Sequence, residues 1–223
     1  IHPFDVPDHF VAEFAPRGVI LSGGPETVTV GATPRLSEAI LQLGVPVLGI
    51  CYGMQTLAEQ LGGEVAGSEQ REFGHAMINA EADSPLIAAL GAVTGVAADV
   101  WMSHGDKVTQ VPDGFVVTAS TPSAPVAAME HQERCLYGVQ FHPEVTHTAK
   151  GGDLLRDFAL DICGCDGEWT SANIVDDAIA RVREQVGDDH VVGALQLVID
   201  RLADIVDASA RHLPEAGLDL LIL

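Results

Sequence analysis

The sequence has few basic residues: 11 lysines and arginines stand against 32 aspartates and glutamates, a formal net charge of −21. A surface this acidic repels phosphate backbones, which excludes non-specific binding to nucleic acid. Cysteine is also scarce, and four cysteines are too few and too scattered for a disulfide framework. The pair Cys163 and Cys165 is spaced too closely for an ordinary zinc site. We therefore expect no metal site and a reducing, cytoplasmic setting.

Long apolar runs are missing as well. No stretch approaches the ~20 residues that a membrane span needs, and no signal peptide is visible. Hydrophobic residues still make up 47% of the 223 residues, enough for a sizeable core. This length allows one large domain, or one domain and part of another. Because the first residue is Ile1 rather than methionine, we expect the chain to be part of a longer protein.

Apolar spacing and turn residues predict short alternating strands and helices near the start of the chain. Strands are expected at 19–22 and 45–50, and helices at 34–43, with Thr33 as N-cap and Pro34 as the first helical residue, and at 54–61. This alternation predicts parallel strands joined by crossovers.

The following region is richer in strand patterns. Strands are expected at 72–79, 99–102, 115–120, 125–130 and 136–141, and a helix at 151–163. We predict an α/β sandwich that closes near Cys165. Beyond it, the pattern predicts helices at 174–186 and 195–213 and strands at 190–195 and 218–223.

The stretch Gly49-Ile50-Cys51-Tyr52-Gly53 places a thiol where a strand turns directly into a helix. This is the pattern of the nucleophile elbow, with sulfur in place of oxygen, and glycines on both sides relieve crowding at the bend. The start of the helix favours a thiolate, and the Tyr52 N–H can face a developing oxyanion. An isolated cysteine is more often a buried, inert side chain, but the paired glycines favour a nucleophile.

A thiolate nucleophile needs a base and a group that orients the base. In YGVQFHPEV, His142 follows an apolar strand and Glu144 comes two residues later. Pro143 favours an extended chain, in which residues two apart project to the same side. The Glu144 carboxylate can then hold the imidazole. Alone, this motif also fits a surface histidine beside a surface glutamate; with Cys51 it predicts a triad.

The motifs GICYGMQ, SGGPE and VQFHPE together resemble those of the class I glutamine amidotransferases. The resemblance implies a flavodoxin-like open sheet, mostly parallel, with helices on both faces. It implies that Cys51 attacks the glutamine amide, with His142 as base and Glu144 as its partner. Gly24 would add a second oxyanion N–H beside that of Tyr52.

The resemblance also implies a set of glutamine-binding residues. Gln55 lies in the first turn after Cys51, and Ser103, His104 and Asp106 belong to the stretch WMSHGD. These side chains would hold the glutamine and read its α-amino and α-carboxylate groups. An ordinary polar loop is the alternative for WMSHGD.

Within this family, CYGMQTLAEQLGGEV, REFGHA, WMSHGDKV, FHPEVTHT and DICGCDGEWTSANIVDDAIARVREQVGDD resemble the GMP synthases. This implies an amidotransferase domain at 1–165, without a tightly bound cofactor, then a linker and partial ATP pyrophosphatase domain at 166–223. XMP would be adenylylated by ATP with Mg²⁺, and ammonia would displace AMP to give GMP. A homodimer through a C-terminal region not present here is also implied.

Two features depart from the GMP synthase pattern. The strand and helix that should precede Ile1 are missing, and Leu195 is followed by Gln196 where a pyrophosphate loop of the type SGGVDS is expected. We therefore assign no ATP or XMP contact to any residue. The amidotransferase of another synthase, such as anthranilate or carbamoyl-phosphate synthase, a γ-glutamyl hydrolase, and a non-catalytic binding module are the alternatives.

Overall fold

The computed structural model of the chain describes residues 2–31, 33–166 and 220–222. Within these residues one sheet contains β1 (Gly18–Leu21), β2 (Val47–Ile50), β3 (Glu64–Ala80), β4 (Ala98–Gln110), β5 (Val116–Ser120), β6 (Ala128–His131), β7 (Leu136–Val139) and β8 (Leu220–Ile222). The helices are α1 (Asp8–Phe14), α2 (Glu38–Gln42), α3 (Tyr52–Gln60), α4 (Pro85–Ala89) and α5 (Gly151–Arg156). A π-helical stretch, Asp157–Ile162, continues α5, and a 3₁₀ turn, Gln132–Arg134, precedes β7.

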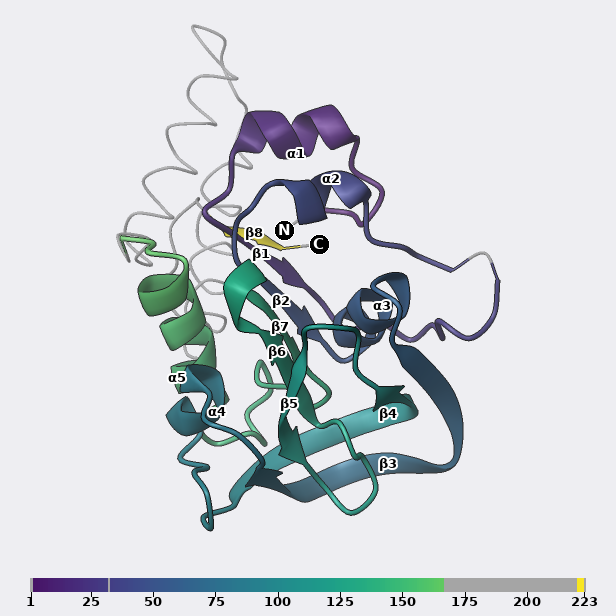
Figure 1. The fold of residues 1–223 in the computed structure, drawn as a ribbon, viewed down its shortest axis with the longest axis vertical. Helices are drawn as coiled ribbons and strands as arrows, with labels where there is room; N and C mark the ends of the chain where they lie inside the picture. Colours follow the sequence, from purple (N-terminus) through teal and green to yellow (C-terminus); the bar gives the residue numbers. More distant parts are fainter. Residues whose placement is uncertain (1, 32, 167–219, 223) are drawn as a thin grey trace, which may run out of the picture.

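The strand order across the sheet is β4-β3-β5-β6-β7-β2-β1-β8 (Figure 1). The pairs β7–β2, β2–β1 and β1–β8 are parallel, whereas the pairs β4–β3, β3–β5, β5–β6 and β6–β7 are antiparallel. The expectation of a mostly parallel open sheet is therefore wrong, and the sheet is mixed. The strands from β5 to β7 follow one another through short turns, which favour antiparallel pairing over crossovers. Long strands β3 and β4 curl across one end of the sheet (Figure 1).

The helices cover both faces of the sheet, as expected. Val19, Leu21 and Val47 point into a core that they share with α1, α2 and α3. Their neighbours Ile20 and Leu48 point the other way, into a core formed with α4, α5 and the π-helical stretch. This alternation is the period of two that places successive strand side chains on opposite faces. None of the helices in the described part of the chain is long and apolar enough to cross a membrane.

Helix α2 is shorter than the sequence predicts. It begins at Glu38, and its N-cap is Ser37, whose hydroxyl accepts from the backbone N–H of Ala39 at 3.1 Å; the predicted cap is wrong. The chain just before Ser37 is bonded to a distant side chain instead. The amide of Gln60 accepts from the Leu36 N–H at 2.7 Å and donates to the Leu36 carbonyl at 2.9 Å. Those tertiary bonds occupy backbone groups that a longer helix would use.

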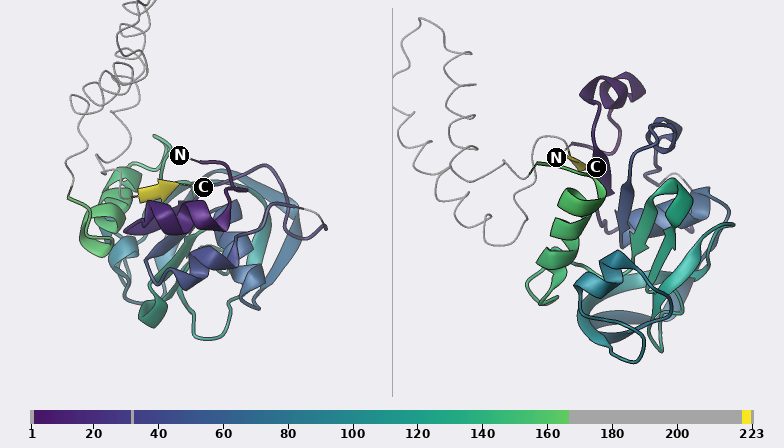
Figure 2. Two further views of the ribbon diagram at one scale, coloured as in Figure 1. Left: turned by 90° about the horizontal axis from the view of Figure 1, so that it is seen from above. Right: turned by 60° about the vertical axis from the view of Figure 1, so that its left-hand side comes forward.

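Other elements differ from the sequence predictions to varying degrees. Helix α3 begins directly after Cys51, two residues earlier than expected, and α1 and α4 were not expected. Strand β8, the yellow arrow in both views of Figure 2, confirms the strand predicted at 218–223. It pairs in parallel with β1. The elements predicted at 174–186, 190–195 and 195–213 lie outside the described residues, as does most of the predicted domain at 166–223.

Two glycines allow α3 to start against the sheet. A Cβ on Gly53 would lie 2.3 Å from the carbonyl oxygen of Leu21, at the end of β1. A Cβ on Gly49 would lie 2.6 Å from the backbone nitrogen of Met54. Both obstacles are backbone atoms, which cannot move aside as a flexible side chain can. The first turn of α3 therefore packs on β1 and β2 only because both positions lack a side chain.

We expect Gly53→Ala to lower the free energy of unfolding by about 1–3 kcal/mol, the usual cost of forcing extra atoms into a packed interior. Gly152→Ala in α5 is the matched control, because a Cβ there meets no atom within 4 Å. Alanine suits a helix interior better than glycine, so the control should keep or gain stability. Urea denaturation measures both, and a Gly53→Ala chain as stable as the parent would contradict the packing argument.

Candidate active site

Cys51 sits at the junction of β2 and α3 in a backbone conformation that is uncommon for a residue with a side chain. Its φ is 51° and its ψ is −103°. Two hydrogen bonds hold it there: its N–H donates to the Val139 carbonyl at 2.8 Å, and its carbonyl accepts from the Gln55 N–H at 3.0 Å. Backbone in this region is usually kept where the surroundings enforce it, often at functional sites. The conformation matches the elbow expected from the sequence.

His142 lies beside Cys51 and is paired with Glu144. The Nδ1 atom of His142 is 2.6 Å from Oε1 of Glu144, and both side chains are partly buried. A Cβ placed on Gly23 would lie 3.1 Å from the imidazole Cε1 and 3.7 Å from the Cys51 Cβ, so thiol and imidazole flank the same small space. The imidazole Nε2 is buried, and among the described residues the Cys51 thiol is the partner left for it. This nitrogen is the one left to exchange a proton.

The surroundings of His142 favour its charged form. The Cys51 thiol contributes most to raising the pKa of His142 to about 10, the hydrogen bond to Glu144 adds to this, and burial opposes both. An imidazolium held between a sulfur and a carboxylate is the arrangement that stabilises a thiolate. The three predicted triad residues therefore meet in space.

The backbone around His142 is tied to β4. The His142 N–H donates to the Trp101 carbonyl at 2.9 Å. The hydroxyl of Thr148 donates to the His142 carbonyl at 2.7 Å and accepts from the Trp101 N–H at 3.0 Å. His142 is thus fixed to the strand that carries the WMSHGD stretch, although it follows β7 in the chain.

Gly24 and Tyr52, expected to supply oxyanion N–H groups, lie against each other. A Cβ on Gly24 would be in ordinary contact with the Tyr52 ring, 3.6 Å from its Cγ. The Tyr52 hydroxyl donates to the Pro34 carbonyl at 2.7 Å, which fixes the ring. A pocket of about 310 Å³ lies beside this turn; Gly23, Gly24, Tyr52, Gly53 and Thr56 are among its lining residues, whereas Cys51 and His142 are not.

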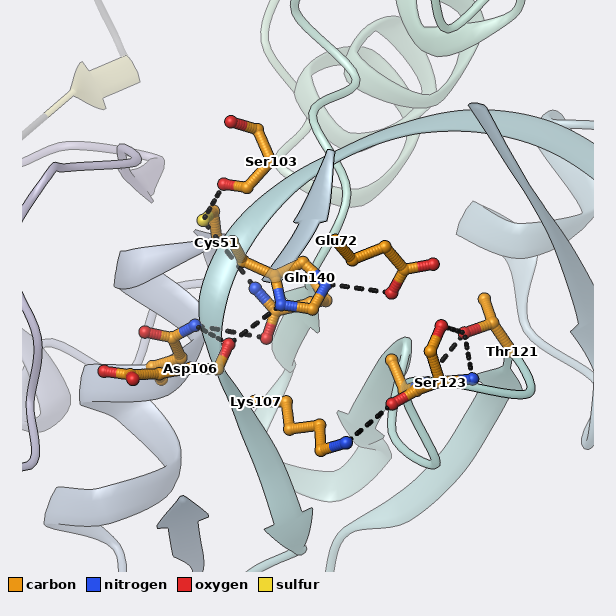
Figure 3. Close-up of polar contacts among 11 residues, drawn as sticks. Cys51, Glu72, Ser103, Asp106, Lys107, Thr121, Ser123 and Gln140 are labelled. Atoms are coloured by element: carbon orange, nitrogen blue, oxygen red, sulfur yellow. Dashed lines mark hydrogen bonds and ion pairs between the residues drawn. The ribbon is translucent and has the colours of Figure 1, made fainter. Parts of the chain in front are cut away.

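The residues expected to bind glutamine gather on one side of Cys51, and most of their polar groups bond to protein. The Ser103 carbonyl accepts from the Cys51 thiol at 3.7 Å (Figure 3). Gln55 is 3% exposed, and its amide donates to the Asp106 carbonyl at 2.8 Å. The Asp106 carboxylate accepts from the hydroxyl of Thr27. The structure brings this set together as expected, but Gln55 and Asp106 are engaged within the protein.

His104 is, with Gln55, one of the two buried members of that set. It is 6% exposed, its Nδ1 lies 3.0 Å from the Asp106 carbonyl, and its Nε2 lies 3.3 Å from a Glu72 carboxylate oxygen. Burial lowers the pKa of His104, and the charge of Glu72 opposes this shift. Because Glu72 is the direct cross-strand partner of His104, the pair also joins β3 to β4 at the site.

Gln140 is a site residue that the sequence reasoning missed. It is fully buried, and its amide nitrogen donates to the Cys51 sulfur at 3.7 Å. The signal was present, because in an extended chain Gln140 projects to the same side as His142 and Glu144. As for a metal, no group of three or more His, Cys, Asp or Glu side chains within the described ranges could hold one.

Residues 1–162 match the sequence family described as glutamine amidotransferase class-I. The chain belongs to this family. Over 204 residues it is 55% identical to a protein named GMP synthase [glutamine-hydrolyzing] from Pseudomonas savastanoi pv. phaseolicola, and 54% identical to one of the same name from Teredinibacter turnerae. Each match covers 90% of this chain but 39% of the relative, so the amidotransferase chain spans about two fifths of these relatives.

A solved structure agrees with the family assignment. A Thermoplasma acidophilum protein, provisionally described as one subunit of a GMP synthase, superimposes with a TM-score of 0.60 at 28% identity, covering 79% of this chain and 83% of that one. The resemblance to class I amidotransferases and GMP synthases is thereby confirmed, as is the amidotransferase fold. The domain boundary at residue 165 and a following ATP pyrophosphatase domain stay predictions.

We expect Glu144→Gln to lower the pKa of His142 from about 10, by about 1–3 units for a lost neighbouring charge. The imidazole Cε1–H resonance, followed by NMR against pH and assigned with His142→Asn, measures this pKa. The control is Glu133→Gln, an exposed glutamate in the 3₁₀ turn, which should leave the titration unchanged. Equal titration curves for the parent and Glu144→Gln would refute the pairing.

The same pKa predicts a pH-dependent stability. A group whose pKa is raised on folding stabilises the fold fully below its ordinary value and loses that effect as the pH rises through the folded value. For His142 the window runs from 6.5 to about 10. Across it, urea denaturation should show the parent losing more stability than Glu144→Gln, whose His142 starts from a lower pKa.

Proposed function

We propose that this chain is the glutamine-hydrolysing part of a GMP synthase and converts glutamine and water to glutamate and ammonia. The observation that carries the proposal is the position of Cys51, at a positive-φ elbow beside the His142–Glu144 pair. The 54–55% identity to proteins named GMP synthase [glutamine-hydrolyzing] supports the choice among amidotransferases.

In the proposed reaction, the Cys51 thiolate forms a bond to the side-chain amide carbon of glutamine, and the carbonyl electrons move onto oxygen. The N–H groups of Gly24 and Tyr52 would face that oxyanion. As the intermediate collapses, protonated His142 gives its proton to the departing nitrogen, and ammonia leaves. A glutamyl thioester remains on Cys51.

In the second half of the reaction, water attacks the thioester. His142, now neutral, takes a proton from the water, and the C–S bond breaks to release glutamate and restore the thiolate. Glu144 would keep the imidazole oriented and steady its charge in both halves. The raised pKa of His142 supports this assignment, because the resting enzyme would hold an imidazolium beside a thiolate.

We propose that Gln55, Ser103, His104 and Asp106 form the glutamine-binding side of the site. Their position supports this, since the Ser103 carbonyl contacts the Cys51 thiol. The Asp106 carboxylate is bonded to Thr27 and the Gln55 amide to the Asp106 carbonyl, so glutamine would have to exchange with these bonds or bind beside them.

The remaining chemistry would belong to the larger part of the synthase that these residues do not cover. There, ATP with Mg²⁺ would adenylylate XMP, and ammonia would displace AMP to give GMP. Ammonia released into water is protonated and loses its nucleophilicity, so the two sites have to be coupled. A linker and partial ATP pyrophosphatase domain at 166–223, a homodimer through a C-terminal region not present here, and the cytoplasmic location are further parts of this proposal.

We expect a chloroketone analogue of glutamine to alkylate Cys51 and free glutamine to protect it, measured by peptide mass spectrometry. Cys51→Ser should remove the label. Cys135→Ser is the matched control and should keep it, because Cys135 lies outside the site. Burial raises the pKa of Cys163 to about 12, so that thiol should stay unlabelled. Labelling of Cys51 that is indifferent to glutamine would support a non-catalytic module instead.

A further inference from the structure

A buried chain of two side-chain amides connects Cys51 to β4 (Figure 3). The Gln55 Nε2 lies 2.8 Å from the Asp106 carbonyl oxygen and 3.2 Å from Oε1 of Gln140. The Gln140 Nε2 lies 3.7 Å from the Cys51 sulfur. Gln140 is 0% exposed and Gln55 is 3% exposed, so water does not compete for these contacts.

Hydrogen-bond chemistry fixes the direction of both amides. A backbone carbonyl can only accept, so Gln55 must turn its NH₂ group toward Asp106. The same NH₂ group also donates to Gln140, so the side-chain oxygen of Gln140 must be the acceptor. The NH₂ group of Gln140 is then the end that faces the Cys51 sulfur. The Asp106 carbonyl on β4 thus fixes the orientation of the Gln55 amide, and Gln55 fixes that of Gln140. As a result, the Cys51 sulfur faces a hydrogen-bond donor.

The sulfur has a second contact of the opposite kind. The Ser103 carbonyl can only accept, and it faces the thiol at 3.7 Å. This contact suits a protonated sulfur and repels a thiolate. The N–H of Gln140 suits a thiolate, because hydrogen bonds to ionised acceptors are the stronger ones, and more so where water is excluded.

We propose that Gln140 is a positioning residue that stabilises the thiolate form of Cys51 and draws the sulfur away from the Ser103 carbonyl. This inference rests on the proposed function, in which Cys51 is the nucleophile. Gln140 is suited to the role because its own backbone is fixed: its N–H donates to the Ala127 carbonyl at 2.9 Å. When the proton passes from Cys51 to His142, the sulfur loses its bond to Ser103 and keeps the one to Gln140.

Titratable side chains also lie on the elements around Cys51. On the elements packed around it they are His142 and Glu144 after β7, Glu72 on β3, and His104, Asp106 and Lys107 on β4. Substituting Gln140 leaves each of these side chains in place. A change in the pH profile of Cys51 alkylation is then caused by the loss of the Gln140 amide and not by the loss of a neighbouring charge.

The test is the pH profile of alkylation of Cys51 by iodoacetamide, without glutamine, in the Cys135→Ser chain. Cys51, Cys163 and Cys165 are all buried, so peptide mass spectrometry follows the Cys51 peptide separately from the peptide that carries Cys163 and Cys165. Gln140→Met keeps the side-chain length and removes the N–H. We expect the midpoint of the profile to move to higher pH and the rate near neutral pH to fall about 10- to 100-fold, as for a lost hydrogen bond to a charged group. Gln110→Met, at an exposed position at the end of β4, is the matched control.

A second pair of variants keeps the test decisive if Gln140→Met does not fold. Gln140→Glu has nearly the same shape, can still accept from Gln55, and turns an oxygen to the sulfur, so its profile should move further to higher pH. Gln55→Met frees the Gln140 amide to rotate, so it should shift the profile less, and it should add nothing in the Gln140→Met chain. Folded Gln140 variants with the parent profile would overturn the proposal.

These outcomes are separable from those of the proposed function. The alkylation profile uses no glutamine, so it reports the sulfur whether or not the chain is a glutaminase. Loss of glutamine protection in the parent would count against the proposed function alone. A parent protected by glutamine, with Gln140 variants that titrate unchanged, would count against Gln140 alone.

Discussion

The close approach of α3 to the sheet is the constraint on which the site depends. With only hydrogen at Gly53 and Gly49, the first turn of the helix packs against the backbone of β1 at Leu21 and of β2 at Gly49. The chain then has no room for a loop between β2 and α3, and Cys51 must make the whole turn with a positive φ. The uncommon backbone conformation of Cys51 thus follows from the absence of two side chains rather than from any group added beside it.

The other parts of the site lie close to Cys51 because the parallel strands β1, β2 and β7 all end at the same edge of the sheet. The turn at Gly23 and Gly24 follows β1, Cys51 follows β2, and His142 lies three residues after β7. Ligand sites in α/β sheets commonly form outside the carboxyl ends of such strands. The antiparallel half contributes differently, because β4 curls over this edge and supplies backbone carbonyls at Ser103 and Asp106 (Figure 3).

The local motifs could be predicted from sequence, and the long-range ones could not. The elbow at Cys51 and the pairing of His142 with Glu144 depend on neighbours within a few residues, and both are found as expected. The start of α2 depends on Gln60, which is 24 residues away, so its cap was misplaced. The lengths of β3 and β4 were underestimated because they are set by pairing with each other rather than by apolar alternation. Gln140 could not be assigned a role from sequence, because the role of its amide depends on contacts with Cys51 and Gln55, which lie far away in the chain.

Thr148 gives the backbone of His142 a second attachment to β4. One hydroxyl bridges the His142 carbonyl and the Trp101 N–H, beside the direct bond between the two backbones. The imidazole therefore takes its position from β4, while the thiol takes its position from β2 and α3. The two are joined again at β7, because the Cys51 N–H donates to the carbonyl of Val139, three residues before His142. The strand that carries the proposed glutamine contacts therefore also holds His142 in place, so that both share one support.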